Sequence, residues 1–220
     1  MPPRLDTSVG PDGLPIKTFR SSAEWKRWLH REHARANGIW LRFFKKVAGI
    51  KGLTYAEALD EALCYGWIDG QARGFDEQSY LQRFTPRRRQ SPWSKINREH
   101  VARLIKTKRM QPAGLAEVER AKADGRWDVA YDSFGTAAPP DDFKAALAKN
   151  KKAKAFFATL SRQNLYAIYF RLHNAKKVET RVRRIAQFVE MLAEERTIYP
   201  QGKKVAKAKP AAQRQITKSQ

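Results

Sequence analysis

Four arginines stand close together in the middle of the chain: Arg83, Arg87, Arg88 and Arg89. A guanidinium group binds phosphate or carboxylate through two parallel hydrogen bonds, and it also stacks on aromatic rings. Aromatic residues are interleaved with the arginines, an arrangement that also holds single-stranded nucleic acid: Tyr80, Phe84 and Trp93. We predict an anion-binding site in this segment, and a solvated arginine surface is the alternative interpretation.

Hydroxyl and amide side chains follow the arginines at the predicted start of a helix. Ser91, Ser94 and Asn97 would donate hydrogen bonds to the same anion, because a helix N-terminus favours negative charge. Alternatively, Ser94 serves only as the helix N-cap. The predicted ligand-binding set extends back to the preceding segment and comprises Trp67, Asp69, Arg83, Arg87, Ser91, Trp93, Ser94 and Asn97.

Asp69 is the one acid of the central segment, in a Trp67-Ile68-Asp69 sequence that predicts a very short strand or turn before Gly70. It is a weak candidate for a general acid or base. An Asx turn before glycine is the favoured interpretation, and an ion pair with Arg83 or Arg87 comes next. No serine has a glycine-elbow pattern around it. We therefore expect a non-catalytic protein, with an enzyme acting on a small anionic substrate as an alternative.

Metal and redox chemistry have little support in the sequence. Cys64 is the single cysteine, which excludes an intramolecular disulfide and a cysteine-based zinc site. His30 and His33 have a spacing that can share a metal ion, but no third ligand accompanies them. No metal and no cofactor are predicted.

A strong excess of positive charge distinguishes the chain. Lys and Arg number 44 against 22 acids, which gives a formal net charge of +22. Such a field attracts polyanions, so a nucleic-acid-binding protein is the second functional hypothesis. The predicted polyanion surface comprises Arg88, Arg89, Lys176, Lys177, Arg181 and Arg184, and a solvated face is its alternative.

Strand-like segments alternate with helical ones in the first part of the chain, and lie at 14–19, 39–46 and 79–84. Thr54, with Glu57 three residues later, has the capping-box pattern of a helix start. The Pro139-Pro140 pair marks a boundary after which only helical patterns follow. The last of these carries an apolar stripe at Val178, Val182, Ile185, Phe188, Val189 and Leu192.

This order predicts an α+β fold: a small, mostly antiparallel sheet with packed helices, then an all-helical C-terminal part and a disordered basic tail. We expect four segments along the chain. They are a flexible arm at 1–13, an α+β domain at 14–138, a helical region at 139–200, and a disordered Lys/Ala-rich tail at 201–220.

Several ordered motifs resemble one known family. The segments Ala58-Leu-Asp-Glu-Ala-Leu-Cys-Tyr-Gly-Trp-Ile-Asp-Gly70, Phe84-Thr-Pro-Arg87, Ser91-Pro-Trp-Ser-Lys-Ile-Asn97, Ala121-Lys-Ala-Asp-Gly-Arg-Trp127 and Ala175-Lys-Lys-Val-Glu-Thr-Arg181 are similar to the YdeI/OmpD-associated, or bacteriocin-protection, family. The resemblance covers roughly residues 14 to 200. It implies a role in resistance to bacteriocins or antimicrobial peptides, and it carries over no catalytic residue.

The expected location is the cytoplasm. The first residues contain no apolar segment of the kind that a signal peptide has, and no stretch approaches the roughly 18 apolar residues of a membrane span. The leading hypothesis is a cytoplasmic, non-catalytic stress or peptide-resistance factor that binds an anionic ligand or acidic partner through Arg83, Arg87, Trp93 and Asn97. The sequence leaves the oligomeric state open.

Overall fold

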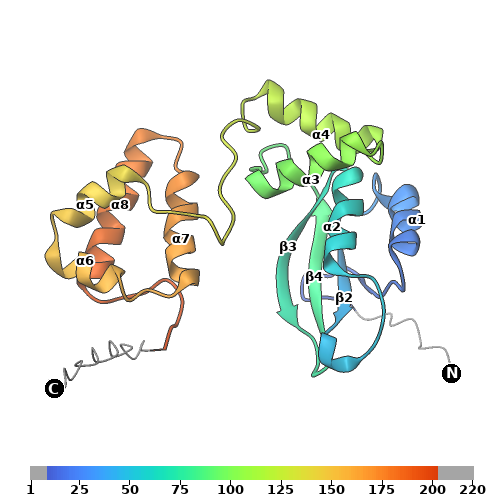
Figure 1. Cartoon of the computed structure of the whole chain (residues 1–220), viewed down its shortest axis with the longest axis horizontal. Coiled ribbons are helices and arrows are strands. Elements are labelled where there is room, and N and C mark those ends of the chain that lie inside the picture. The colour runs from blue at the N-terminus through green and yellow to red at the C-terminus, as the bar shows by residue number, and fades with distance from the viewer. Residues whose placement is uncertain (1–8, 203–220) are drawn as a thin grey trace, which may run out of the picture. The chain divides into compact units, whose positions relative to one another are not determined.

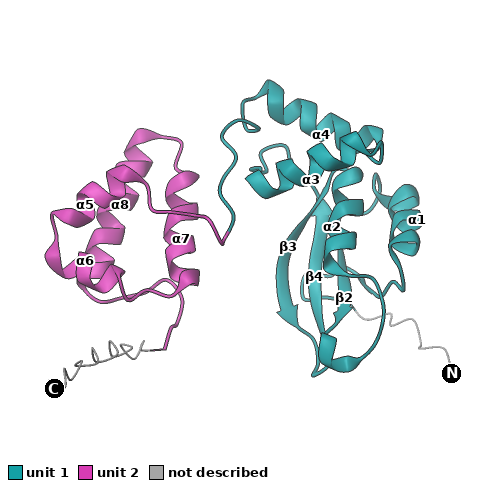
Figure 2. Ribbon diagram, in the orientation of Figure 1, with its two compact units in different colours: residues 1–133 teal, residues 134–220 magenta. Residues whose placement is uncertain are grey.

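The computed structural model describes residues 9–202 and divides the chain into two compact units, Met1–Ser133 and Phe134–Gln220 (Figure 2). The division falls shortly before Pro139. Most of the predicted flexible arm, residues 1–8, and the predicted disordered tail from residue 203 onward lie outside the described residues.

A four-stranded sheet forms the centre of unit 1 (Figure 1). Its strands are β1 (Ile16–Lys17), β2 (Ile39–Phe44), β3 (Trp67–Gly74) and β4 (Ser79–Pro86). They are ordered β1-β2-β4-β3, and only the β1–β2 pair is parallel. The predicted small, mostly antiparallel sheet is confirmed. β3 is much longer than the short strand or turn predicted around Asp69, because the chain continues through a bulge between Asp69 and Ala72 and still pairs with β4.

Among residues 9–133, the sheet is accompanied by four α-helices and one short 3-10 helix: α1 (Ser22–Glu32), η1 (Lys46–Ala48), α2 (Tyr55–Cys64), α3 (Lys95–Lys106) and α4 (Pro112–Ala123). Local sequence explains where they begin. Thr54 and Glu57 form the predicted capping box, which satisfies two backbone donors at the start of α2. The Ser94 hydroxyl accepts a hydrogen bond from the backbone N–H of Asn97 and so caps α3.

The main core of unit 1 lies between the sheet and its helices. Strand β2 turns Ile39, Leu41 and Phe43 toward this core. Trp40 alternates to the other side of the sheet, where it packs with a second, smaller apolar cluster. Trp67 lies deep in the main core, with its ring edge-on to two α1 tryptophans at centroid distances of 6.3 and 5.6 Å.

Helix α4 crosses very close to the end of α2. A Cβ atom at Gly114 would lie 2.2 Å from the carbonyl oxygen of Cys64, which is far inside van der Waals contact. Only glycine allows the two backbones to approach this closely. The contact fixes α4 beside the end of α2. The segment that follows α2 in the chain is the start of β3, which carries Trp67 and Asp69.

The described part of unit 2, residues 134–202, contains four helices: α5 (Asp141–Ala148), α6 (Lys151–Phe157), α7 (Arg162–His173) and α8 (Val178–Ala193). Its core contains Phe143, Leu172 and Leu192, so the predicted all-helical C-terminal part is confirmed. The predicted apolar stripe of α8 is wrong at its start, because Val178 and Val182 are 71% and 62% exposed. The inward-facing row of α8 runs through Arg181 instead.

Candidate functional site

Arg87 directly follows strand β4, and its guanidinium is enclosed by the loop that leads to α3. The backbone N–H of Arg87 donates to the carbonyl of Gly66 at 2.9 Å, which fixes the residue beside the start of β3. Its side chain is only 6% exposed, and the guanidinium carbon lies 3.5 Å from the centroid of the Trp93 ring. The predicted combination of arginine and tryptophan is therefore a direct stacking contact.

The Arg87 guanidinium lacks an acidic partner within the described part of the chain. No carboxylate of residues 9–202 lies within ion-pair distance of it, and its one hydrogen bond goes to the Pro92 carbonyl at 3.3 Å. Its Nε atom and the Nε1 atom of Trp93 are buried donors without an acceptor among those residues. Buried polar groups usually have partners, so two adjacent unsatisfied donors indicate a place where an acceptor binds.

Arg126 is a matched comparison for Arg87, because it is also only 6% exposed. Its guanidinium lies 2.7 Å from the Asp124 carboxylate and donates to the Ser91 carbonyl at 2.7 Å. This arginine neutralises its charge within the protein and holds the loop that contains Ser91. Arg87 differs from it in lacking a carboxylate partner.

Burial lowers the pKa of Arg87 to about 10, while Tyr131, Glu117 and Asp69 raise it. The group is still a cation at neutral pH. Placing a cation in a water-poor environment costs free energy unless a counter-charge accompanies it. An anionic ligand would provide that counter-charge and would also satisfy the orphan Nε donor.

The Tyr131 side chain and the acids Glu117 and Asp69 act on the charge of this cation. The Tyr131 hydroxyl is hydrogen-bonded with Ser94, and burial raises the pKa of Tyr131 while the charge of Arg87 lowers it. The Tyr55 hydroxyl donates to the Asp69 carboxylate at 2.8 Å, and burial together with Asp69 raises the pKa of Tyr55. Both hydroxyls therefore remain protonated at neutral pH, and the Tyr55 proton is donated to the Asp69 carboxylate.

The structure brings part of the predicted ligand-binding set together. Ser91, Trp93 and Ser94 share the loop with Arg87, and Asn97 is buried in the first turn of α3. The Ser91 hydroxyl accepts from the Arg88 backbone N–H at 3.0 Å, so it shapes the loop.

Two members of the predicted set lie elsewhere. Trp67 belongs to the main core, where its Nε1 donates to the His33 carbonyl at 3.1 Å. Arg83 pairs with Trp40 in the sheet register and so lies on the sheet face away from the main core. Its Nε atom is 2.7 Å from the Asp12 carboxylate. Of the predicted set, Trp93 and Asp69 interact with the Arg87 guanidinium. Ser91, Ser94 and Asn97 follow in the same loop and the first turn of α3.

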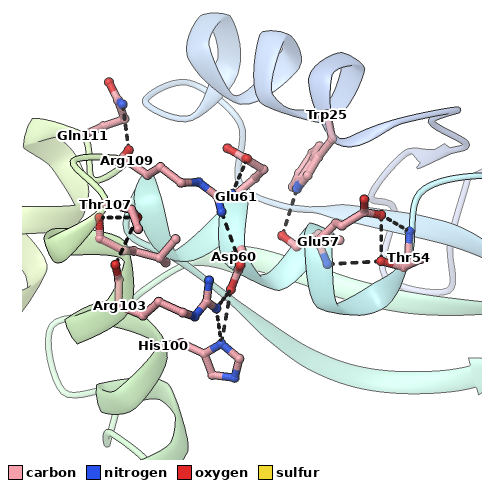
Figure 3. Close-up of polar contacts among 12 residues, drawn as sticks. Trp25, Thr54, Glu57, Asp60, Glu61, His100, Arg103, Thr107, Arg109 and Gln111 are labelled. Carbon is pink, nitrogen blue, oxygen red and sulfur yellow. Dashed lines mark hydrogen bonds and ion pairs between the residues drawn. The ribbon is translucent and has the colours of Figure 1, made fainter.

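An ion-pair network on α2 had no counterpart in the sequence analysis. Asp60 lies 2.7 Å from Arg103, 3.2 Å from His100 and 3.5 Å from Arg109, which also contacts Glu61 at 2.6 Å (Figure 3). The sequence signal for this network was the pair of adjacent acids, Asp60 and Glu61, within the buried apolar stripe of α2. The partners come from α3 and the α3–α4 connection, at a distance in sequence that no local pattern reveals.

This network joins helices and has no nucleophile beside it. Cys64, one turn further along α2, is buried, and burial raises its pKa to about 12. Its thiol therefore stays protonated and unreactive at neutral pH. The network ties α2 to α3, and we assign it a structural role.

The predicted polyanion surface separates into exposed and engaged residues. Arg88, Arg89, Lys176 and Lys177 are exposed. Arg181 instead binds Asp142 through two nitrogens, at 2.5 and 2.9 Å, and donates to the Leu172 carbonyl. Arg184 donates to the Arg171 carbonyl, so both residues stabilise unit 2 internally.

Within residues 9–202, no group of three or more His, Cys, Asp or Glu side chains is arranged to hold a metal ion. None of the helices in that range has both the length and the apolar composition needed to cross a membrane.

Two family models match the chain. Residues 136–195 match the family described as Bacteriocin-protection, YdeI or OmpD-Associated, and residues 17–117 match a Domain of unknown function (DUF8412). The first match confirms the resemblance over residues 136–195, within the helical unit 2. The motifs around Asp69 and Arg87 lie in the region of the second match. No curated protein and no solved structure matches the chain.

Proposed function

We propose that unit 1 binds a small oxyanion, a phosphate or carboxylate group, at Arg87. One observation carries this proposal: a buried guanidinium, stacked on Trp93, has no carboxylate partner in the described residues and retains an unsatisfied donor. Guanidinium recognition of an oxyanion uses two parallel N–H donors and needs no metal. The proposal describes a binding protein without catalysis.

The neighbouring groups limit the shape of the ligand. The buried Trp93 Nε1 is a donor that suits a further oxygen of the anion. Asp69 repels negative charge, so the proposed ligand presents its anionic end to Arg87 and a hydroxyl or amine toward Asp69. A small molecule with one compact anionic group fits this distribution of charge better than a uniformly charged polyanion.

The family name supplies the biological setting of the proposal. The match of residues 136–195 to the YdeI/OmpD-associated family model supports a role in stress or antimicrobial-peptide resistance, exerted from the cytoplasm through an anionic ligand or acidic partner. Direct capture of a cationic peptide is disfavoured, because the chain itself carries a formal charge of +22.

A thermal-shift screen tests the proposal on the full chain with phosphate, pyrophosphate, carboxylates and nucleotides at constant ionic strength. All six tryptophans precede Phe134, so tryptophan fluorescence reports on unit 1. A ligand should raise the melting temperature of the wild type and of Arg83→Ala, and leave Arg87→Met unchanged. Equal shifts in all three proteins, or no shift with any anion, would rule the site out.

A further inference from the structure

A hollow in unit 2 has a different chemistry from the proposed oxyanion site of unit 1. Its volume is about 260 Å³, and its lining residues are Phe134, Gln163, Tyr166, Ala167, Phe170, Arg171 and Tyr199. One row of α7 forms its floor, since five of these residues recur along that helix at intervals of three, one, three and one. Aromatic rings from before and after the helices form its walls.

Both walls are held in place by polar side chains of α7. Asn164 is 1% exposed, and its side chain exchanges two hydrogen bonds with the backbone of Tyr199, at 2.9 and 3.0 Å. Arg162 donates to the carbonyls of Phe134 and Gly135, with 2.9 Å to the former. The rings are therefore positioned before any ligand arrives, which lowers the entropic cost of binding.

The aromatic rings offer stacking surfaces. Phe134 and Tyr199 are 49% and 38% exposed, which is unusual for rings of this size. The Tyr166 ring lies 5.3 Å from that of Phe134 and 6.0 Å from that of Phe170. The volume is below the range typical of pockets for drug-sized ligands, so the hollow suits a single flat ring system.

The charge of the lining residues determines which kind of flat ligand the hollow favours. The Arg171 guanidinium carbon lies 5.9 Å from the Tyr199 ring centroid, and no acidic side chain lines the hollow. Gln163 is exposed at its edge, and its amide offers both a donor and an acceptor. Lys and Arg outnumber Asp and Glu in unit 2. These features suit a flat ring that is attached to a negatively charged chain.

We infer that the hollow binds a base of single-stranded nucleic acid, stacked on Tyr166 and Tyr199 with the phosphate chain toward Arg171 and the neighbouring basic side chains. Base–aromatic stacking is tolerant of sequence and adds a salt-insensitive part to the affinity, whereas phosphate contacts weaken steeply with salt. The site stands independently of the oxyanion site at Arg87.

The first test measures fluorescence anisotropy of a labelled oligodeoxythymidylate of about 15 nucleotides with the full chain over a range of salt. Tyr166→Leu keeps an apolar side chain but removes the ring, and it should weaken binding about tenfold with the salt slope unchanged. Tyr166→Phe keeps the ring and should bind within about twofold of the wild type. Circular dichroism checks that both variants fold.

Photocrosslinking locates the contact without any substitution. An oligonucleotide carrying 5-iododeoxyuridine should crosslink to the tryptic peptide 163–171, which contains Tyr166 and Phe170. Equal affinity of Tyr166→Leu and the wild type, or crosslinks only in unit 1 or after residue 202, would show that charge alone attracts the strand and overturn the inference. Absence of oligonucleotide binding at low salt would overturn it as well.

Discussion

The guanidinium carbon of Arg87 lies 3.5 Å from the centre of the Trp93 ring, and the two side chains each retain a buried donor without an acceptor in the described residues. A cation–π contact accounts for the orientation of the arginine but leaves its charge uncompensated. Arg126, equally buried, has both a carboxylate and a carbonyl partner. The difference between these two arginines is the main reason to place a ligand at one of them.

Replacing Arg87 should cost little stability. Arg87→Met loses a cation–π contact of about 0.5–2 kcal/mol and one weak hydrogen bond, but it also removes a buried charge. We expect its free energy of unfolding to stay within about 1 kcal/mol of the wild type in urea titrations followed by tryptophan fluorescence. Arg126→Met is the matched control and should lose about 1–3 kcal/mol. A larger loss in Arg87→Met than in Arg126→Met would mean that Arg87 is a structural residue.

We expect protonation of Asp60 to contribute to the unfolding of unit 1 at acidic pH. Burial raises its pKa, but the hydrogen bond and charge of Arg103, helped by His100, outweigh this, and the pKa is lowered overall. A lowered pKa in the folded state means that the unfolded chain takes up the proton first. The stabilisation is therefore complete above the ordinary aspartate pKa of about 4 and is lost as pH falls through the folded value.

Asp60→Asn should consequently destabilise unit 1 by about 2–3 kcal/mol at neutral pH and flatten the acid limb of its stability curve. Glu119→Gln removes an exposed pair with Lys122 on α4 and should change stability by less than about 1 kcal/mol. Urea unfolding at several pH values measures both effects. An unchanged acid limb in Asp60→Asn would refute the assigned role of the network.

Gly114→Ala tests the close approach of α4 to α2. The added methyl group would meet the Cys64 carbonyl, so the helices must separate, at a cost of about 1–3 kcal/mol. Gly74→Ala is the control, because a Cβ there meets nothing within 4 Å and its φ is not positive. The melting temperature should fall for Gly114→Ala alone, and equal melting temperatures would show that the backbones are further apart.

Arg181 should act as a clamp within unit 2. Its two bonds to Asp142 and one to the Leu172 carbonyl link α5, α7 and α8, so Arg181→Ala should destabilise this unit by about 1–3 kcal/mol. Arg183→Ala, at an exposed position two residues later, should be close to neutral. Unit 2 contains no tryptophan, so amide hydrogen exchange of its helices is the suitable measurement. Similar exchange rates in both variants would contradict the clamp.

Local features of the fold were predictable from the sequence because they depend on neighbours in the chain. The cap at Ser94 and the capping box at Thr54 involve residues three positions apart, and alternation sends Phe84 and Arg83 to opposite sheet faces. The contacts that define the site depend instead on tertiary partners. Nothing local distinguishes Arg83, which meets Asp12 across the sheet, from Arg87, which meets no acid in the described residues.

The same limit applies to α8 and to the network on α2. The apolar stripe drawn through Val182 failed because Arg181, with its partner Asp142 on another helix, occupies the inward row. Asp60 and Glu61 are buried only because Arg103 and Arg109 reach them from beyond α2. Apolar periodicity alone therefore gives a wrong prediction where a charged residue lies on the buried face of a helix.

The most direct test of the anion site is the unfolding free energy of unit 1 as a function of phosphate concentration, at constant ionic strength with chloride as the replacement ion. A ligand that binds only the folded state adds RT ln(1 + [L]/Kd) to that free energy. The wild type and Arg83→Ala should become more stable as phosphate replaces chloride, and Arg87→Met should not respond. The same phosphate dependence in Arg87→Met and the wild type would contradict an anion site at Arg87.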